Sequence, residues 1–156
     1  MRYFEDYPLG CVFEYDEKYL ISEDEIMEVG RRWDPQPFHI DPDMARNTPF
    51  GGLVASSVLL FAVAISLGNR VKEKERPAAV SALGFNNMQM HSPARPGDEL
   101  SLRSTVIESR VSNSHPNLGV VNCRNEISNQ QNELVFVYEG AAFIKRRIQQ
   151  GKQQMT

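Results

Sequence analysis

Hydrophobic and polar positions follow two different periods in the first third of the chain. Residues 11–21 (CVFEYDEKYLI) are rich in aromatic and β-branched side chains, which predicts a strand. Residues 22–25 (SEDE) then have the composition of a helix N-terminal capping box. Ile26, Val29 and Trp33 follow at spacings of three and four. This pattern predicts a helix that lays one apolar stripe on the core and ends before the next proline.

Residues 53–67 (LVASSVLLFAVAISL) carry no charge and are followed by a Gly-Asn stop signal, which predicts a buried helix. At about 1.5 Å per residue such a helix is roughly 22 Å long, too short for a membrane span but long enough to cross a sheet. A helix that is apolar on all sides must be covered on most of them. We therefore expect a curved sheet or a partner subunit to cover it, and we predict a homodimer or a higher homo-oligomer.

The second half of the chain is rich in predicted strands. Four segments with strand composition, separated by turn-forming residues, are 80–90, 99–111, 119–128 and 134–145. In segment 99–111, Leu100, Leu102, Ser104 and Val106 alternate with polar neighbours, as in an antiparallel strand with one solvent-exposed face. The last segment is apolar on both faces and should be central. Together these elements predict the α+β hot-dog arrangement, in which a curved antiparallel sheet wraps around a long apolar central helix.

The composition of the chain limits its organisation and its partners. With 156 residues and 41% hydrophobic content, it suits one domain, residues 1–147, followed by a polar tail, 148–156. A net charge of −3 and the absence of a long basic run argue against nucleic acid as a partner. The N-terminus lacks the features of a signal peptide, so we expect a cytoplasmic protein with no membrane association. Cys11 and Cys123 stand in no metal-binding spacing and are predicted to be free thiols, with no metal site.

Residues 33–52 (WDPQPFHIDPDMARNTPFGG) lie between the two predicted helices and have the composition of a turn. They also contain an aspartate and a histidine, side chains that a turn alone does not require. Asp34 and His39 lie five residues apart on a backbone stiffened by prolines. Asp41 and Pro42 provide a cap and a first-turn proline, which predict a short helix from residue 43 to about 47. We interpret Asp41 as that cap rather than as a third acid.

This segment resembles the signature of a known family. Residues 34–39 (DPQPFH) and 50–56 (FGGLVAS) resemble the D-x-N-P-x-H and F-G-x-x-I-A-H-G motifs of MaoC-like dehydratases and (R)-specific enoyl-CoA hydratases, which have the hot-dog fold. Residues 3–10 (YFEDYPLG) and 91–100 (HSPARPGDEL) also have counterparts in that family. The family's asparagine is Gln36 here, its His-Gly pair is Ser56-Ser57, and a serine of some members falls at Ile65.

The resemblance implies (R)-specific hydration of a trans-2-enoyl-CoA, or the reverse dehydration of a 3-hydroxyacyl-CoA. Asp34 and His39 would hold one water molecule, with His39 preferred as the base because an imidazole exchanges protons near neutral pH. How the two proton transfers are divided between them stays open. A backbone N–H near Ser57, at the start of the apolar helix, would stabilise negative charge on the thioester oxygen. The residues implied to contact the substrate are Gln36, Gly51, Gly52, Ser56 and Ser57.

The substrate would be a thioester of coenzyme A or of an acyl carrier, and no other cofactor is implied. Two alternative functions remain: a hot-dog acyl-CoA thioesterase and a non-catalytic acyl-CoA or acyl-carrier-binding module. Thioesterases that activate water with a carboxylate on the central helix are disfavoured, because residues 53–67 contain no Asp or Glu. His91 and His115 are interpreted as loop residues. Arg95 and the basic residues 145–147 are interpreted as surface charge.

Overall fold

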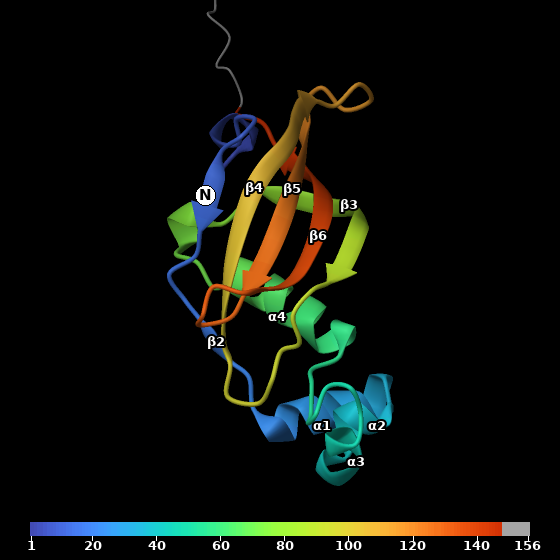
Figure 1. Ribbon diagram of the computed structural model, residues 1–156. Helices are drawn as coiled ribbons and strands as arrows, with labels where there is room; N and C mark the ends of the chain where they lie inside the picture. The colour runs from blue at the N-terminus through green and yellow to red at the C-terminus, as the bar shows by residue number, and fades with distance from the viewer. Residues whose placement is uncertain (148–156) are drawn as a thin grey trace, which may run out of the picture.

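The structure is a computed structural model that describes residues 1–147. A six-stranded antiparallel sheet curves around one helix, and three shorter helices form a cluster beyond one end of the sheet (Figure 1). The strand order is β1-β4-β5-β6-β3, and β2 also pairs with β4. The strands are β1 (Val12–Glu14), β2 (Tyr19–Leu20), β3 (Ala79–Met90), β4 (Glu99–Val111), β5 (Leu118–Ser128) and β6 (Leu134–Lys145). The helices are α1 (Glu23–Trp33), α2 (Pro37–Ile40), α3 (Pro42–Arg46) and α4 (Ser57–Asn69), with 3₁₀ turns η1 (Phe4–Asp6) and η2 (Glu73–Glu75).

The four long strands of the second half are confirmed to within one residue at each end. The alternation in β4 is also confirmed, because Leu100, Leu102, Ser104 and Val106 are all buried. β6, predicted to be central, lies between β5 and β3. β3 is the terminal strand on its side, so one of its edges has no neighbouring strand within residues 1–147. The fold is the predicted α+β hot-dog arrangement.

The strand expected over residues 11–21 is wrong as a single element, because it divides into β1 and β2. Glu14 pairs with Arg103 and Tyr19 pairs with Leu100. The segment from Glu14 to Tyr19 therefore advances five residues while β4 advances only three. The excess residues between Glu14 and Tyr19 cannot remain in register, and the chain leaves the sheet there.

The expected helix after residue 22 is confirmed as α1. The hydroxyl of Ser22 accepts a hydrogen bond from the Glu25 N–H, as an N-cap does, and Ile26 is fully buried. The assignment of Trp33 to the apolar stripe is wrong: its side chain is 62% exposed, with the Arg32 guanidinium over its ring. Trp33 is the last residue of α1, which belongs to the helical cluster beyond the end of the sheet (Figure 1).

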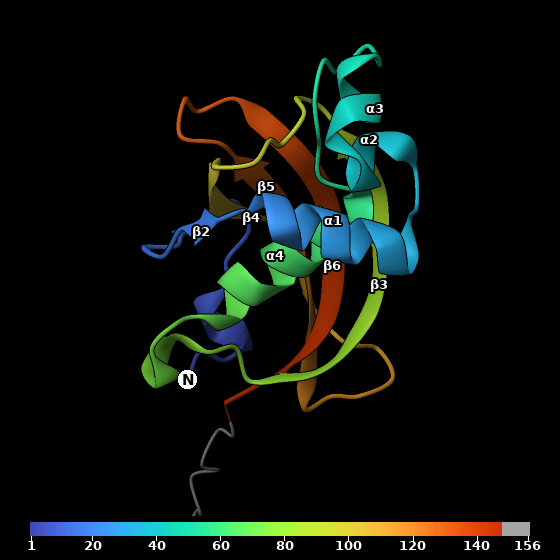
Figure 2. The ribbon, with the colours of Figure 1, turned by 90° about the horizontal axis from the view of Figure 1, so that it is seen from below.

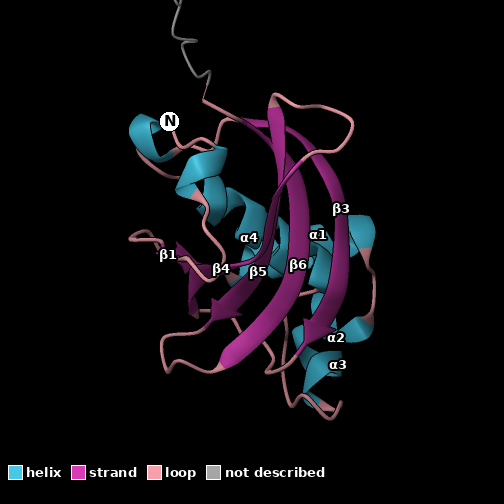
Figure 3. Cartoon of the chain, turned by 90° about the horizontal axis from the view of Figure 1, so that it is seen from above, coloured by secondary structure: helices cyan, strands magenta, loops and turns pink. Residues whose placement is uncertain are grey.

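Helix α4 crosses the concave face of the sheet (Figures 2 and 3). It begins at Ser57, later than the predicted residue 53, because the preceding residues use their backbone groups elsewhere. The Val54 N–H donates to the Phe38 carbonyl (3.0 Å), and the Ala55 N–H donates to the Ala94 carbonyl (2.9 Å). Among the described residues, no helix has both the length and the apolar character required to cross a bilayer.

One side of α4 packs in the core and the other does not. The buried residues are Leu59, Leu60, Val63, Ala64 and Leu67. Val58 and Ile65, on the remaining surface, are about two-fifths exposed. The apolar helix is therefore not fully covered by the described part of its own chain.

Candidate active site

A short helix that the sequence analysis did not predict brings Asp34 and His39 together. Asp34 ends α1, where its N–H donates to the Gly30 carbonyl (2.9 Å). The chain then turns at Gln36, whose carbonyl accepts the His39 N–H (2.9 Å), and α2 begins with Pro37 in its first turn. Proline suits this position because the first helical N–H groups have no intrahelical acceptor. The resulting turn directs the His39 side chain back toward the end of α1.

The side chains of Asp34 and His39 face each other. Asp34 Oδ2 lies 3.3 Å from His39 Nε2, and the two side chains are 32% and 7% exposed. His39 Nδ1 lies 2.6 Å from the carbonyl oxygen of Val54. A carbonyl only accepts hydrogen bonds, so Nδ1 carries a proton and donates it to Val54.

This hydrogen bond determines the chemistry of the other ring nitrogen. In a neutral imidazole with a proton on Nδ1, Nε2 is an acceptor, and it faces a carboxylate that is also an acceptor. Two acceptors cannot bond to each other directly. A proton between Asp34 and His39, or a water molecule that donates to both, resolves the conflict. A pair of this kind can accept a proton from a water molecule bound beside it.

A pocket of about 230 Å³ opens beside this pair. Its lining includes Asp34, His39, Phe38, Phe50, Ser57 and His91. The Phe38 ring stands edge-on to the His39 imidazole, with 4.5 Å between ring centroids, and lies 5.2 Å from the Phe50 ring. These aromatic contacts restrict rotation of the imidazole and give the pocket an apolar wall.

The first turn of α4 borders the same pocket. Ser57, the first residue of the helix, lines it. Ser56 is the N-cap: its buried hydroxyl accepts a hydrogen bond from the Leu59 N–H (3.3 Å). The N–H groups of the first helical turn have no intrahelical acceptor, and the positive end of the helix dipole lies with them. A developing negative charge in the pocket would be stabilised at this position.

The sequence-predicted residues divide into two groups. Asp34, His39 and Ser57 line the pocket, whereas Gln36, Gly51, Gly52 and Ser56 are not among the lining residues. Gly51 has a φ of +68°, a left-handed conformation that favours glycine, so its role here is in the turn after Phe50. The prediction for Asp41 is confirmed, because its carboxylate accepts the N–H groups of Asp43 and Met44 at the start of α3.

Two features of this site were missed in the sequence. His91, interpreted as a loop residue, does follow β3 directly, but it also lines the pocket.

Gly30 lies where α1 meets α2, and a Cβ atom added there would be 2.9 Å from both Cβ and the carbonyl oxygen of His39. A glycine inside an otherwise regular helix was a usable signal, since it costs about 1 kcal/mol relative to alanine and requires a compensating reason.

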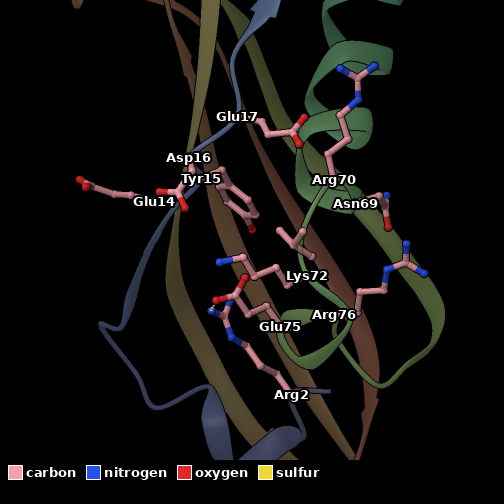
Figure 4. Close-up of a pocket in the computed structure, with 11 residues that line it drawn as sticks. Arg2, Glu14, Tyr15, Asp16, Glu17, Asn69, Arg70, Lys72, Glu75 and Arg76 are labelled. Atoms are coloured by element: carbon pink, nitrogen blue, oxygen red, sulfur yellow. Dashed lines mark ion pairs between the residues drawn. The ribbon is translucent and has the colours of Figure 1, made fainter.

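A larger pocket, of about 560 Å³, lies at the other end of α4 and shares no lining residue with the first (Figure 4). Its charged side chains have both signs: Arg2, Arg70, Lys72 and Arg76 against Glu14, Asp16, Glu17 and Glu75. Some are already paired, such as Arg2 with Glu75 at 3.9 Å, and Arg70 lies over the Tyr19 ring. It contains no imidazole to pair with a carboxylate, so the smaller pocket is the candidate active site.

Cys11 and Cys123 are free thiols, as predicted. Within residues 1–147, no three His, Cys, Asp or Glu side chains gather closely enough to hold a metal ion.

The curved sheet around α4, with an Asp/His pair beside the first turn of that helix, defines a hot-dog protein of the dehydratase type. Residues 8–129 match the family described as "MaoC like domain". The chain belongs to the MaoC-like family.

Solved structures share the fold, and one of them is a MaoC-like dehydratase at 30% identity. The MaoC-like dehydratase from Rhodospirillum rubrum is 30% identical with a TM-score of 0.85, over 96% of this chain and 100% of that one. The R-hydratase PhaJ1 from Pseudomonas aeruginosa is 20% identical with a TM-score of 0.71, over 99% of this chain and 94% of that one. RV0216 from Mycobacterium tuberculosis, described as having a double hot-dog fold, is 19% identical with a TM-score of 0.76, over 96% of this chain and 46% of that one.

Proposed function

We propose that this protein adds water to the double bond of a trans-2-enoyl thioester with (R) stereochemistry, or removes it in the reverse reaction. Membership of the MaoC-like family and the likeness to an R-hydratase support this reaction class. The observation that carries the proposal is the pair of acceptors, Asp34 Oδ2 and His39 Nε2, 3.3 Å apart beside a pocket that also borders the first turn of α4. The thioester would be carried by coenzyme A or an acyl carrier protein, and a cytoplasmic location stays a prediction.

The reaction needs three groups, and each has a candidate in the pocket. The oxygen of the held water attacks C3 while the water gives one proton to the Asp34–His39 pair. Electrons of the double bond move toward the thioester carbonyl, whose oxygen becomes negative and accepts an N–H from the first turn of α4, at Ser57. A proton then returns from the pair to C2. Atoms balance without an external oxidant or reductant.

The two alternative functions predict different chemistry in the same pocket. A thioesterase would direct the water at the carbonyl carbon, and α4 carries no carboxylate to activate it. A binding module would use the Asp34–His39 contact only to order the chain. His39 donates its Nδ1 proton to the Val54 carbonyl, so Nε2 is left as a hydrogen-bond acceptor. An acceptor nitrogen that faces the pocket favours acid–base chemistry over a purely structural role.

Crotonyl-CoA separates these functions in one assay. Hydration lowers the absorbance of the conjugated thioester without releasing a thiol, hydrolysis releases the thiol, and a binding module does neither. We expect Asp34→Asn and His39→Ala to lower hydration at least about a hundredfold, the usual scale for lost acid–base participation. Asp41→Asn is the matched control, because an asparagine still caps α3 and residue 41 does not line the pocket. Near-full activity in both site variants would refute the proposal.

We also propose that two copies of the chain associate through the groove between β3 and α4. Four apolar residues of the terminal strand, Val80, Phe85, Met88 and Met90, are 43% to 52% exposed. They lie with the exposed Val58 and Ile65 along pockets that α4 and β3 share. Contiguous exposed apolar surface of this kind marks an interface. The double hot-dog description of RV0216, of which this chain matches 46%, supports a second copy of the same fold as the partner.

A further inference from the structure

Arg95 joins two segments that line the candidate active site. Phe50 lines the pocket from the turn that follows α3, and residues 91–93 line it from the connection between β3 and β4. Arg95 belongs to that connection, and its Nη2 donates to the Phe50 carbonyl oxygen at 2.6 Å, across 45 positions of the chain. A hydrogen bond from a charged donor is stronger than one between neutral groups. Arg95, interpreted from the sequence as surface charge, therefore has a defined partner at the pocket.

The backbone from which the Arg95 side chain extends is itself held in place. The Arg95 N–H donates to Asp98 Oδ2 (2.8 Å), and the Asp98 N–H donates to the Arg95 carbonyl (3.1 Å). The carbonyl of the fully buried Ala94 accepts the N–H of Ala55 (2.9 Å), just before α4. Because these contacts anchor Arg95 at its backbone, its guanidinium holds the turn at Phe50 in place rather than following it.

The Phe50 side chain depends on this turn for its position. It is 38% exposed, so the core holds only part of it. Its ring lies 5.2 Å from the Phe38 ring, which in turn lies 4.5 Å from the His39 imidazole. Loss of the Arg95 hydrogen bond would release the turn and let the Phe50 ring shift. His39 would keep its orientation, because its own hydrogen bond is to Val54.

We propose that Arg95 is a positioning residue for hydration: through the Phe50 carbonyl, it fixes the Phe50 ring as a wall that places the enoyl thioester against the bound water. This inference rests on the proposed function, because it requires that substrate to occupy the pocket of Asp34 and His39. Arg95 acts through Phe50 and does not itself touch the reacting atoms. Misplacement of a reacting group by about 1 Å can cost up to about a hundredfold in rate, so a wall of the pocket can control turnover.

Steady-state hydration of crotonyl-CoA measures this contribution. Arg95→Met keeps an apolar stem of similar length but removes every hydrogen-bond donor. We expect it to lower kcat roughly tenfold to a hundredfold, because the double bond is no longer held at the water. KM should change by less than about threefold, since binding of the remainder of the thioester is retained. A role in folding alone would instead lower stability and leave kcat of the folded protein unchanged.

Arg95→Lys provides the rescue. The contact with Phe50 uses a single nitrogen, so a lysine, with one charged donor group on a long stem, can replace it. Its kcat should lie within about threefold of that of the unaltered protein.

A double-mutant cycle tests whether Arg95 acts through the Phe50 ring. Phe50→Ala removes the ring but leaves the carbonyl, so the hydrogen bond to Arg95 can still form. If the ring transmits the effect, Arg95→Met should lower kcat by less than about twofold in the Phe50→Ala background. Arg46→Met is the matched control, because Arg46 is exposed, pairs with Asp43 at 2.8 Å and does not line the pocket. Its kcat should equal that of the unaltered protein.

Additive losses in this cycle would overturn the inference, as would an Arg95→Met variant with the kcat of the unaltered protein. A comparison with crotonyl-pantetheine, which has no phosphate, provides a further test. If Arg95→Met impairs only the reaction of crotonyl-CoA, Arg95 binds a phosphate of the carrier and the inference is wrong. Each of these results leaves hydration by the unaltered protein intact. Absence of hydration in the unaltered protein would refute the proposed function, and this inference with it.

Discussion

His39 Nδ1 lies 2.6 Å from the carbonyl oxygen of Val54, and this contact joins α2 to the extended segment before α4. The same segment is held from the other direction by the Val54 N–H, which donates to the Phe38 carbonyl. The imidazole and the start of α4 are therefore placed relative to each other by two hydrogen bonds between residues far apart in the sequence. The same two contacts therefore determine both the orientation of the His39 imidazole and the position of the N-terminus of α4.

Gly30→Ala should misplace His39. The new Cβ would be 2.9 Å from the His39 carbonyl oxygen, a backbone atom that moves only if α2 moves. Displacements of about 1 Å at a reacting group cost up to about a hundredfold in rate, so we expect hydration to fall roughly tenfold to a hundredfold. The free energy of unfolding should fall by about 1–2 kcal/mol, the cost of overpacking less the higher helix propensity of alanine.

Gly68→Ala provides the comparison for that variant. Gly68 is also helical, but a Cβ there would lie 3.6 Å from the Leu102 side chain, an ordinary contact. Crotonyl-CoA assays and chemical denaturation of both variants measure the two effects. Equal activity in Gly30→Ala and Gly68→Ala would show that the close approach of α1 and α2 does not position the base.

Ser56→Ala should lower stability more than it lowers catalysis. The Ser56 hydroxyl is buried and accepts the Leu59 N–H, so its loss removes the cap of α4 and costs about 1–2 kcal/mol in the free energy of unfolding. Because the backbone N–H groups at the start of α4 remain, kcat for hydration should change by less than about threefold. Ser22→Ala, which removes the exposed cap of α1, is expected to cost less stability. A drop in kcat comparable to that of Asp34→Asn would assign the hydroxyl itself to the chemistry.

Cys123 should react slowly with alkylating reagents. Burial raises the pKa of its thiol to about 11, and only the thiolate is nucleophilic. At pH 8 the thiolate is then roughly a thousandth of the population, and the labelled fraction should increase about tenfold per pH unit toward pH 11. Iodoacetamide labelling of a Cys11→Ser variant, followed by mass spectrometry, measures this rate. The same protein unfolded in guanidinium should react far faster, and equal rates in the two states would contradict a raised thiol pKa in the folded protein.

Val80→Lys should weaken self-association. Val80 is 52% exposed on the terminal strand, and a lysine there would place an unpaired charge inside the proposed interface. Sedimentation velocity should show the unaltered protein as a dimer and the variant shifted toward monomer. Leu20→Lys is the control: Leu20 is also an exposed apolar residue, but it lies in β2, which pairs with β4 away from β3. If the unaltered chain sediments as a monomer, the interface is excluded directly.

Local patterns along the chain were sufficient for much of the fold. The alternation of Leu100, Leu102, Ser104 and Val106 predicts the inner face of β4, because side chains of a strand point alternately to its two faces. The Ser22 and Asp41 caps were also predictable, since a cap binds N–H groups two or three residues away. The break between β1 and β2 was not, because it arises from the register of both with β4, a strand some eighty residues later in the chain.

For the site, the sequence by itself supplied the candidate pair: Asp34 and His39 were recognisable from their spacing and their resemblance to a family motif. Only the tertiary structure decided what these residues face. The Val54 carbonyl that orients His39, the close approach of Gly30, and the arrival of His91 and Met90 beside the pocket all join segments that are distant in sequence. Hydrogen bonding and packing between such segments depend on where the whole sheet and α4 place them, and no local pattern of residues encodes that position.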